Sequence, residues 1–178
     1  MRITSKSPTV LTPSAGEAAE LDELDLQLVA ALQSDGRRAF ADIAPELGVS
    51  EGAIRRRYRR LVSAGLLQVV GVADPFKIGY GTMTMIGVKV SIDADRSIDA
   101  VGLEIAHFPE VSYVVMTTGT YDLLVEVITR NNEEFTRFLM DRLHRVPGVT
   151  STEAFMLLRV YKMNYGGWRT VRVDDSKP

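Results

Sequence analysis

The sequence of 178 residues predicts a two-domain α+β protein, with a small helical domain followed by a sheet domain of βαββαβ order. Three observations lead to this prediction. Apolar residues recur at helical spacing from residue 21 to residue 61, and beyond residue 82 they recur at every second position. Between the two patterns lies a turn-forming stretch, Asp74-Pro75 followed by Gly79 and Gly81. This stretch separates the two domains.

The composition is that of an ordinary globular protein and excludes several classes of function. The formal net charge is -2, so any contact with nucleic acid has to come from a local basic patch. The chain has no cysteine and only two histidines, His107 and His144, so we expect no disulfide, no metal site and no cofactor. No stretch approaches the roughly 18 consecutive apolar residues of a membrane helix. We therefore expect a cytoplasmic protein without a membrane partner.

The expected boundaries follow from these shifts in pattern. Residues 1–19 are rich in Ser, Thr, Pro and Ala and predict a disordered tail, and residues 162–178 form a C-terminal tail of no assigned role. The helical domain covers residues 20–66, a linker strand and hinge cover residues 67–81, and the sheet domain covers residues 82–161.

Two helices are predicted before residue 48. The first begins after the N-cap Asp22, ends before Gly36, and carries an apolar face at helical spacing, formed by Leu21, Leu24, Leu28 and Leu32. The second covers about residues 41–47, and Gly48 after it supplies the positive φ of a tight turn. Pro45 lies inside this second helix, where we expect it to shorten or kink the helix.

The third predicted helix begins after the N-cap Ser50 and is strongly basic. Ile54, Tyr58 and Leu61 are spaced i, i+4 and i+7 and form its buried stripe. This spacing leaves five arginines on the remaining surface: Arg55, Arg56, Arg57, Arg59 and Arg60. Gly52 and Ala53 are small enough to let the helix end approach base edges closely.

Helix, short turn and basic helix form a helix-turn-helix, whose second helix enters the major groove of DNA. An expected strand over residues 66–73 makes the domain winged-helix-like. A solvated, salt-bridged helix face is the alternative interpretation of the arginines. The acidic residues of the domain lie outside the stretch from Arg55 to Arg60, and this segregation favours a surface that binds nucleic acid.

The sheet domain is predicted from its alternating strands. A strand from Thr82 places Ile86, Val88, Val90 and Ile92 on one face. The later elements are a helix, two strands, a helix and a strand, over residues 97–107, 111–117, 123–129, 132–146 and 150–161. The order βαββαβ predicts a ferredoxin-like sheet with both helices on one face. The other face, with Met83, Met85, Tyr113 and Val115, would be exposed unless a second subunit covers it, so we expect a homo-oligomer.

The stretch that joins the two middle strands, residues 117–122, has the groups that a small zwitterion needs. It offers backbone amides, hydroxyls, an aromatic ring and a carboxylate, from Thr118, Gly119, Thr120, Tyr121 and Asp122. A plain turn explains the same residues, because Gly, Thr and Asp are common in turns.

With these residues placed, residues 21–161 resemble the Lrp/AsnC, or feast/famine, family of prokaryotic transcriptional regulators. The matching stretches include Leu21-Asp22-Glu23-Leu24-Asp25, Leu47-Gly48-Val49-Ser50, Gly65-Leu66-Leu67, Asp74-Pro75, Pro109-Glu110-Val111 and Thr118-Gly119-Thr120-Tyr121-Asp122. Three residues depart from the pattern: Pro45, Phe40 in place of a Ser or Thr cap, and Glu51, which would repel phosphates.

The resemblance implies a sequence-specific, nucleoid-associated regulator that binds double-stranded DNA as a homodimer or as a tetramer of dimers, an octamer. It implies DNA contacts from Ser50, Arg55, Arg56 and Arg57. It also implies an effector, an amino acid or related metabolite, bound between subunits at Gly119, Tyr121 and Asp122. The hairpin is then better explained as a ligand or assembly site than as a plain turn.

Two alternatives remain open. Siroheme decarboxylase subunits resemble the same architecture, and an enzyme of that kind would need proton donors facing a tetrapyrrole. His107 and His144 are poorly placed for this task, and the arginine-rich helix argues for DNA. The other alternative is a DNA-binding assembly protein that responds to no ligand.

Overall fold

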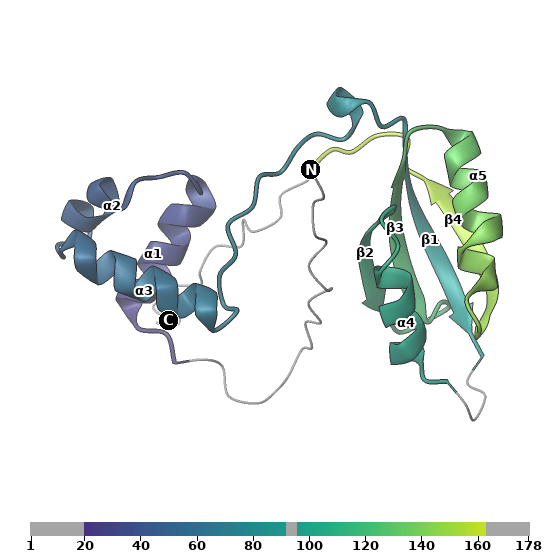
Figure 1. Cartoon of the computed structure of the whole chain (residues 1–178), viewed down its shortest axis with the longest axis horizontal. Helices are drawn as coiled ribbons and strands as arrows, with labels where there is room; N and C mark the ends of the chain where they lie inside the picture. Colours follow the sequence, from purple (N-terminus) through teal and green to yellow (C-terminus); the bar gives the residue numbers. More distant parts are fainter. Residues whose placement is uncertain (1–19, 92–95, 163–178) are drawn as a thin grey trace, which may run out of the picture. The chain divides into compact units, whose positions relative to one another are not determined.

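A computed structural model describes residues 20–91 and 96–162 of the chain (Figure 1). The chain divides after Val72 into two compact units. The tail predicted over residues 1–19, residues 163–178 of the C-terminal tail, and Ile92 all lie outside the described residues.

The first unit consists of three helices: α1 (Glu23–Ser34), α2 (Phe40–Glu46) and α3 (Glu51–Ser63). The predicted N-caps Asp22 and Ser50 are confirmed. Asp22 and Asp25 form a capping box, in which each carboxylate accepts a hydrogen bond from the backbone N–H of the other residue. The apolar stripes of the helices meet in one core, formed by Leu28, Leu32, Ile43, Ala44, Ile54 and Leu61.

Helix α2 is short and lacks a side-chain cap. Its N-cap is Ala39, and Phe40 is the first helical residue, with its ring 5.0 Å from the ring of Tyr58 on α3. Pro45 lies in the last turn, and Gly48 has φ +67° in the turn that leads to α3. Aromatic packing onto α3 therefore supports the start of α2, where a hydroxyl cap was absent from the sequence.

The strand predicted over residues 66–73 is wrong for the single chain. Residues 67–74 have no regular secondary structure, because a strand needs a hydrogen-bonded neighbour and the described residues provide none. Leu67 packs against the first core, and Val69 lies 3.0 Å from where a Cβ on Gly36 would stand. Contacts of the helical unit thus continue beyond residue 66, and a short 3-10 helix, η1 (Phe76–Ile78), follows.

The second unit has the predicted βαββαβ order. Its elements are β1 (Thr82–Val90), α4 (Ile98–Ala106), β2 (Val111–Met116), β3 (Leu123–Thr129), α5 (Asn132–Asp141) and β4 (Val149–Met156). The strands form one antiparallel sheet in the order β2-β3-β1-β4 (Figure 1). Val101 of α4 and Phe138 of α5 share one core with Ile86 and Val125, so both helices cover the same sheet face.

Two predicted elements are shorter than expected. The helix predicted to reach Val146 ends at Asp141, because Arg142 leaves helical geometry and its guanidinium pairs with Glu110; a 3-10 helix, η2 (Leu143–Arg145), follows. The strand predicted to reach Tyr161 ends at Met156. Its partner β1 begins at Thr82, so few β1 residues remain to pair with a longer strand.

The face of the sheet opposite the helices, called here the open face, has several exposed apolar side chains. Tyr113 and Phe155 keep 49% and 45% of their surface exposed. Met83, expected to be exposed, is buried within the single chain, since it lies on the inner strand β1 opposite Ile128. The open face is thus covered in part by the chain itself.

Candidate functional site

Four of the five arginines of α3 form two groups, and the first group faces α1. The Arg57 Nη1 lies 2.6 Å from Asp22 Oδ2 and 2.9 Å from Asp25 Oδ1, and Arg60 also pairs with Asp25. The Asp25 side chain is fully buried. The expected segregation of acids from arginines is therefore wrong for these residues, because carboxylates remote in sequence reach α3 in space.

The ionisation of this cluster is fixed by its partners. Burial raises the pKa of Asp25, but hydrogen bonds from Arg57, Arg60 and the Asp22 backbone N–H outweigh it and hold that pKa below its ordinary value. Hydrogen bonds to Asp22 and Asp25 raise the pKa of Arg57 in return. The carboxylate stays charged at neutral pH and ties α1 to α3.

The second group of arginines points away from α1. Arg56 and Arg59 are exposed, and neither forms an ion pair with any residue that the structure describes. Gly52, Arg56 and Arg59 are spaced i, i+4 and i+7, so they share one helix face. This face, called here the outer face of α3, is opposite the buried Ile54.

Arg55 occupies an intermediate position at the edge of the outer face. It forms an i,i+4 ion pair with Glu51, and its guanidinium carbon lies 5.6 Å from the centre of the Phe40 ring. Glu51 is the first residue of α3, and Phe40 is the first residue of α2. Glu51, expected to repel phosphates, is thus partly neutralised by Arg55 within the same helix.

The N-terminal end of α3 is open. Ser50 Oγ accepts a hydrogen bond from the backbone N–H of Ala53 at 3.2 Å, so this hydroxyl caps the helix. A Cβ on Gly52 would meet only Ser50 Oγ, at 4.0 Å. The structure therefore places a small residue without close neighbours at the end of the helix, beside the unpaired arginines.

The hairpin over residues 117–122 is anchored to the sheet by Asp122. The Asp122 Oδ2 accepts a hydrogen bond from the Val90 backbone N–H at 2.8 Å, and the Asp122 N–H donates to the Val88 carbonyl at 2.9 Å. Thr118, Gly119 and Thr120 are exposed at the tip, where Gly119 has φ +111°. The carboxylate expected to bind an ammonium group is therefore already engaged through one of its oxygens.

Tyr121 folds onto the open face of the sheet. Its half-buried ring lies over Gly87, whose added Cβ would fall 2.5 Å from Tyr121 Cγ. On another side the ring meets Phe155, with 6.2 Å between ring centres and an angle of 72°. Gly87 did not stand out in the sequence, because its only signal is a glycine inside a strand pattern.

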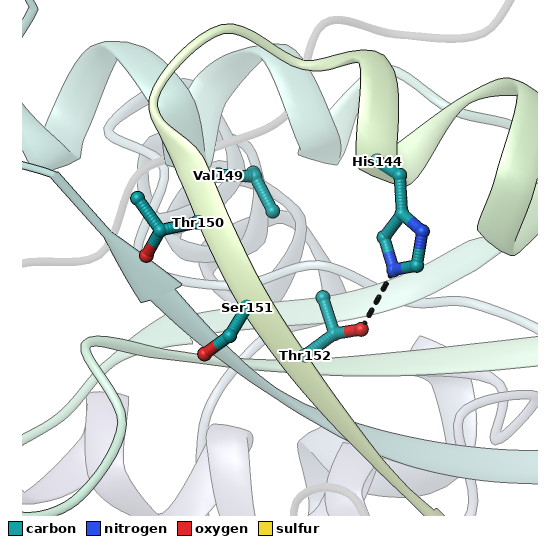
Figure 2. A pocket seen from close by; sticks show the side chains of 5 residues that line it. All are labelled: His144, Val149, Thr150, Ser151 and Thr152. Atoms are coloured by element: carbon teal, nitrogen blue, oxygen red, sulfur yellow. Dashed lines mark hydrogen bonds between the residues drawn. The ribbon is translucent and has the colours of Figure 1, made fainter.

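A small pocket near β4 was also missed by sequence reasoning. It has a volume of about 240 Å³ and is lined by His144, Val149, Thr150, Ser151 and Thr152 (Figure 2). His144 Nε2 lies 2.8 Å from Thr152 Oγ1. The pocket is smaller than the roughly 300–1,000 Å³ of ordinary ligand pockets, and its sequence signal is only a run of hydroxyl residues.

The described residues hold neither a membrane-spanning helix nor a cluster of metal ligands. Within the described residues, no helix combines the length and the apolar character needed to cross a membrane. Across residues 20–91 and 96–162, no three His, Cys, Asp or Glu side chains gather where they could hold a metal ion. His107 Nδ1 lies 2.6 Å from the Leu103 carbonyl oxygen, at the end of α4. The arginines of α3 and the hairpin thus remain the candidate sites.

Comparison with known proteins agrees with both domains. The AsnC-type helix-turn-helix domain matches residues 21–62, and the Lrp/AsnC ligand binding domain matches residues 83–166. An uncharacterised HTH-type transcriptional regulator of Pyrococcus horikoshii is 32% identical over 158 residues, which are 88% of this chain and 98% of the relative. HTH-type transcriptional regulator FL11 of the same species is 34% identical over 80% of this chain and 92% of its own.

A solved structure supports the fold. It is a transcriptional regulator–L-Met complex from Neisseria meningitidis, with a TM-score of 0.73 and 23% identity, covering 83% of this chain and 96% of that chain. The relatives fix the family, and the solved structure agrees with the fold. The chain belongs to the Lrp/AsnC family and is a transcriptional regulator with a helix-turn-helix domain and a ligand-binding domain.

Proposed function

We propose that this regulator reads DNA with the outer face of α3. Arg56 and Arg59 contact phosphates or guanine edges, Arg55 contributes from the edge of the face, and the end of the helix at Ser50, Gly52 and Ala53 approaches the bases. The observation that carries the proposal is the pair of exposed guanidiniums, Arg56 and Arg59, aligned with Gly52. Unpaired guanidiniums can neutralise phosphates without first giving up a carboxylate partner.

Arg57 and Arg60, which belonged to the sequence-based set, take a different role in this proposal. Their ion pairs with Asp22 and Asp25 hold α3 against α1. They position the helix and do not contact DNA themselves. The chain thus divides five neighbouring arginines between orientation of the helix and recognition of its ligand.

Arg56→Ala tests the DNA-binding proposal. Affinity for DNA from upstream of the gene should fall about tenfold at physiological salt, because one guanidinium contact contributes on the order of 1–3 kcal/mol. If Arg56 contacts a phosphate, the slope of log affinity against log salt should also decrease by about 1. Mobility-shift titrations at four salt concentrations measure both quantities.

The matched control is Arg137→Ala, which removes an exposed arginine of α5 paired with Glu133 in the other unit. Its DNA affinity should equal that of the wild type. Equal affinity of Arg56→Ala and wild type would show that another surface reads the DNA.

We further propose that the hairpin binds an amino acid. The L-Met complex of the Neisseria meningitidis regulator, which has the same fold, supports this class of effector. In this chain the available groups are the amides around Gly119, the hydroxyls of Thr118 and Thr120, the exposed part of the Tyr121 ring, and Asp122 Oδ1. Calorimetric titration with each of the twenty amino acids tests the proposal, and no heat from any of them would favour the ligand-independent alternative.

We also propose that two copies pair through the open face and the linker, and that dimers assemble further into an octamer. Exposed Tyr113 and Phe155 support the first contact, and exposed Val70 and Val72 in a segment without a strand partner support the second. Sedimentation velocity at two protein concentrations measures the assembly; a monomer at both would contradict it.

We infer that regulation at the nucleoid, not catalysis, is the function. The names of the relatives as transcriptional regulators support this inference. Each histidine has a partner of its own in the described part of the chain, Leu103 for His107 and Thr152 for His144. A titration with a porphyrin followed by absorbance tests the enzyme alternative, and a tight spectral shift would favour it.

A further inference from the structure

Gly87 lies in the middle of β1. A side chain at this position would project from the open face, and glycine leaves that space empty of its own atoms. Its neighbours across the ladders are Leu124 on β3 and Glu153 on β4. The Tyr121 ring occupies that position: a Cβ on Gly87 would be 2.5, 2.6 and 2.7 Å from three of its ring carbons. Ordinary carbon contacts begin near 3.4 Å, so the ring can lie this low only above a glycine.

The ring is held in this place by one aromatic neighbour and by the anchor of the residue that follows it. Phe155 of β4 meets it edge to face at 6.2 Å, a geometry that aromatic pairs favour. The next residue, Asp122, binds the β1 backbone at Val88 and Val90. The backbone of the hairpin is therefore fixed on β1 immediately after the ring.

We propose that Gly87 is a positioning and specificity-determining residue of the effector site. It sets the height at which the Tyr121 ring lies above the sheet, and so the aromatic surface that the hairpin offers to an amino-acid side chain. The inference rests on the proposed effector role of the hairpin. Any side chain at position 87 would lift the ring by about 1 Å, and displacements of that size impair binding sites.

A double-mutant cycle tests the contact itself in the full-length protein. Gly87→Ala should lower the melting temperature by about 3–8 °C, because overpacking against an aromatic ring is destabilising. In a Tyr121→Ala background the same change should leave the melting temperature unchanged or raise it, since alanine is favoured over glycine within a strand. If Gly87→Ala lowered the melting temperature equally in the wild-type and Tyr121→Ala backgrounds, the proposal would be overturned.

The matched control is Gly102→Ala on α4. A Cβ there would lie 3.6 Å from Leu123, an ordinary contact, so the melting temperature should be unchanged or higher. If Gly87→Ala fails to fold, the double variant Gly87→Ala/Tyr121→Ala should restore folding. If neither Gly87→Ala nor the double variant folded, the proposal would also be overturned.

Calorimetric titration with L-methionine, L-leucine and L-alanine tests specificity. For the amino acid that binds wild type most tightly, Gly87→Ala should weaken binding at least tenfold, while Gly102→Ala leaves it unchanged. Unchanged affinity in Gly87→Ala would overturn the inference alone. If the wild type bound none of the three, nor any other amino acid, the proposed effector role itself would fail, and Gly87's role in specificity with it.

Discussion

Helix α3 and the hairpin over residues 117–122 hold their proposed ligand-binding groups in different ways. On α3 the outward arginines, Arg56 and Arg59, are unpaired among the described residues, and the inward arginines hold the helix in place. In the hairpin, Tyr121 and Asp122 are themselves engaged with the sheet. Changes on the outer face of α3 should therefore affect binding alone, whereas changes in the hairpin should affect folding and binding together.

The largest expected effect comes from Asp25, the buried carboxylate behind α3. Asp25→Ala leaves two guanidiniums without their buried partner and opens the capping box, so the free energy of unfolding should fall by about 2–3 kcal/mol. Urea denaturation measures this loss. Asp42→Ala, which removes an exposed carboxylate from the first turn of α2, is the control and should change stability by less than about 1 kcal/mol. An Asp25→Ala variant as stable as wild type would remove the distinction between inward and outward arginines.

The pKa of Asp25 also predicts a dependence of stability on pH. Because this pKa is lower in the folded chain than in the unfolded chain, the stabilisation is complete above the ordinary aspartate pKa and is lost as pH falls through the folded value. The difference in unfolding free energy between wild type and Asp25→Asn should therefore be constant from about pH 6 to 8 and shrink below about pH 4. A difference independent of pH down to pH 2 would contradict the assignment.

Asp122 should give an intermediate effect that sharpens the comparison. Asp122→Ala leaves the Val90 N–H without its acceptor, so stability should fall by about 1–2 kcal/mol and amino-acid affinity should fall in the same variant. Chemical denaturation and calorimetry on one preparation measure both. Thr118→Ala, at the exposed tip, is the control and should leave stability unchanged. Full stability of Asp122→Ala would show that the hairpin is as independent of the fold as the outer face of α3.

The smallest effect is expected on the helix-covered side of β1, away from the hairpin contacts at Gly87, Val88 and Val90. Thr84 Oγ1 is buried and lacks a hydrogen-bond partner among the described residues. Thr84→Val keeps the shape and removes the unpaired hydroxyl, so stability should rise by up to about 1 kcal/mol. Thermal melting measures the change. A clear loss of stability would indicate that the hydroxyl has a partner, such as an internal water.

Most of the regular elements follow from local patterns and were predicted. The strand over Leu123–Thr129 has the predicted ends, and the buried stripe of α3 contains Ile54 and Leu61 as expected. Local patterns could not predict that α5 ends at Asp141. Helix signals are weak there, and the end is set by Arg142, which reaches Glu110 and the Phe108 ring in the turn before β2.

Local patterns were also insufficient to predict the contacts within the candidate sites. The sequence identified the basic helix and the hairpin, but it could not divide the arginines by role. That division depends on Asp22 and Asp25, which lie more than 30 residues away in sequence. The contact between Gly87 and Tyr121 also joins residues far apart along the chain. Such contacts arise from the packing of elements, so periodicity within an element does not reveal them.

The ion pairs between α1 and α3 also have a genetic consequence. A screen for loss of promoter control should recover substitutions at Asp25 together with substitutions at Arg56, although Asp25 is buried away from the outer face. Dominance would separate the two classes. If the chain assembles and binds DNA as proposed, a folded Arg56 variant would join wild-type subunits, inactivate the mixed assemblies and be dominant. An unstable Asp25 variant would be degraded and be recessive.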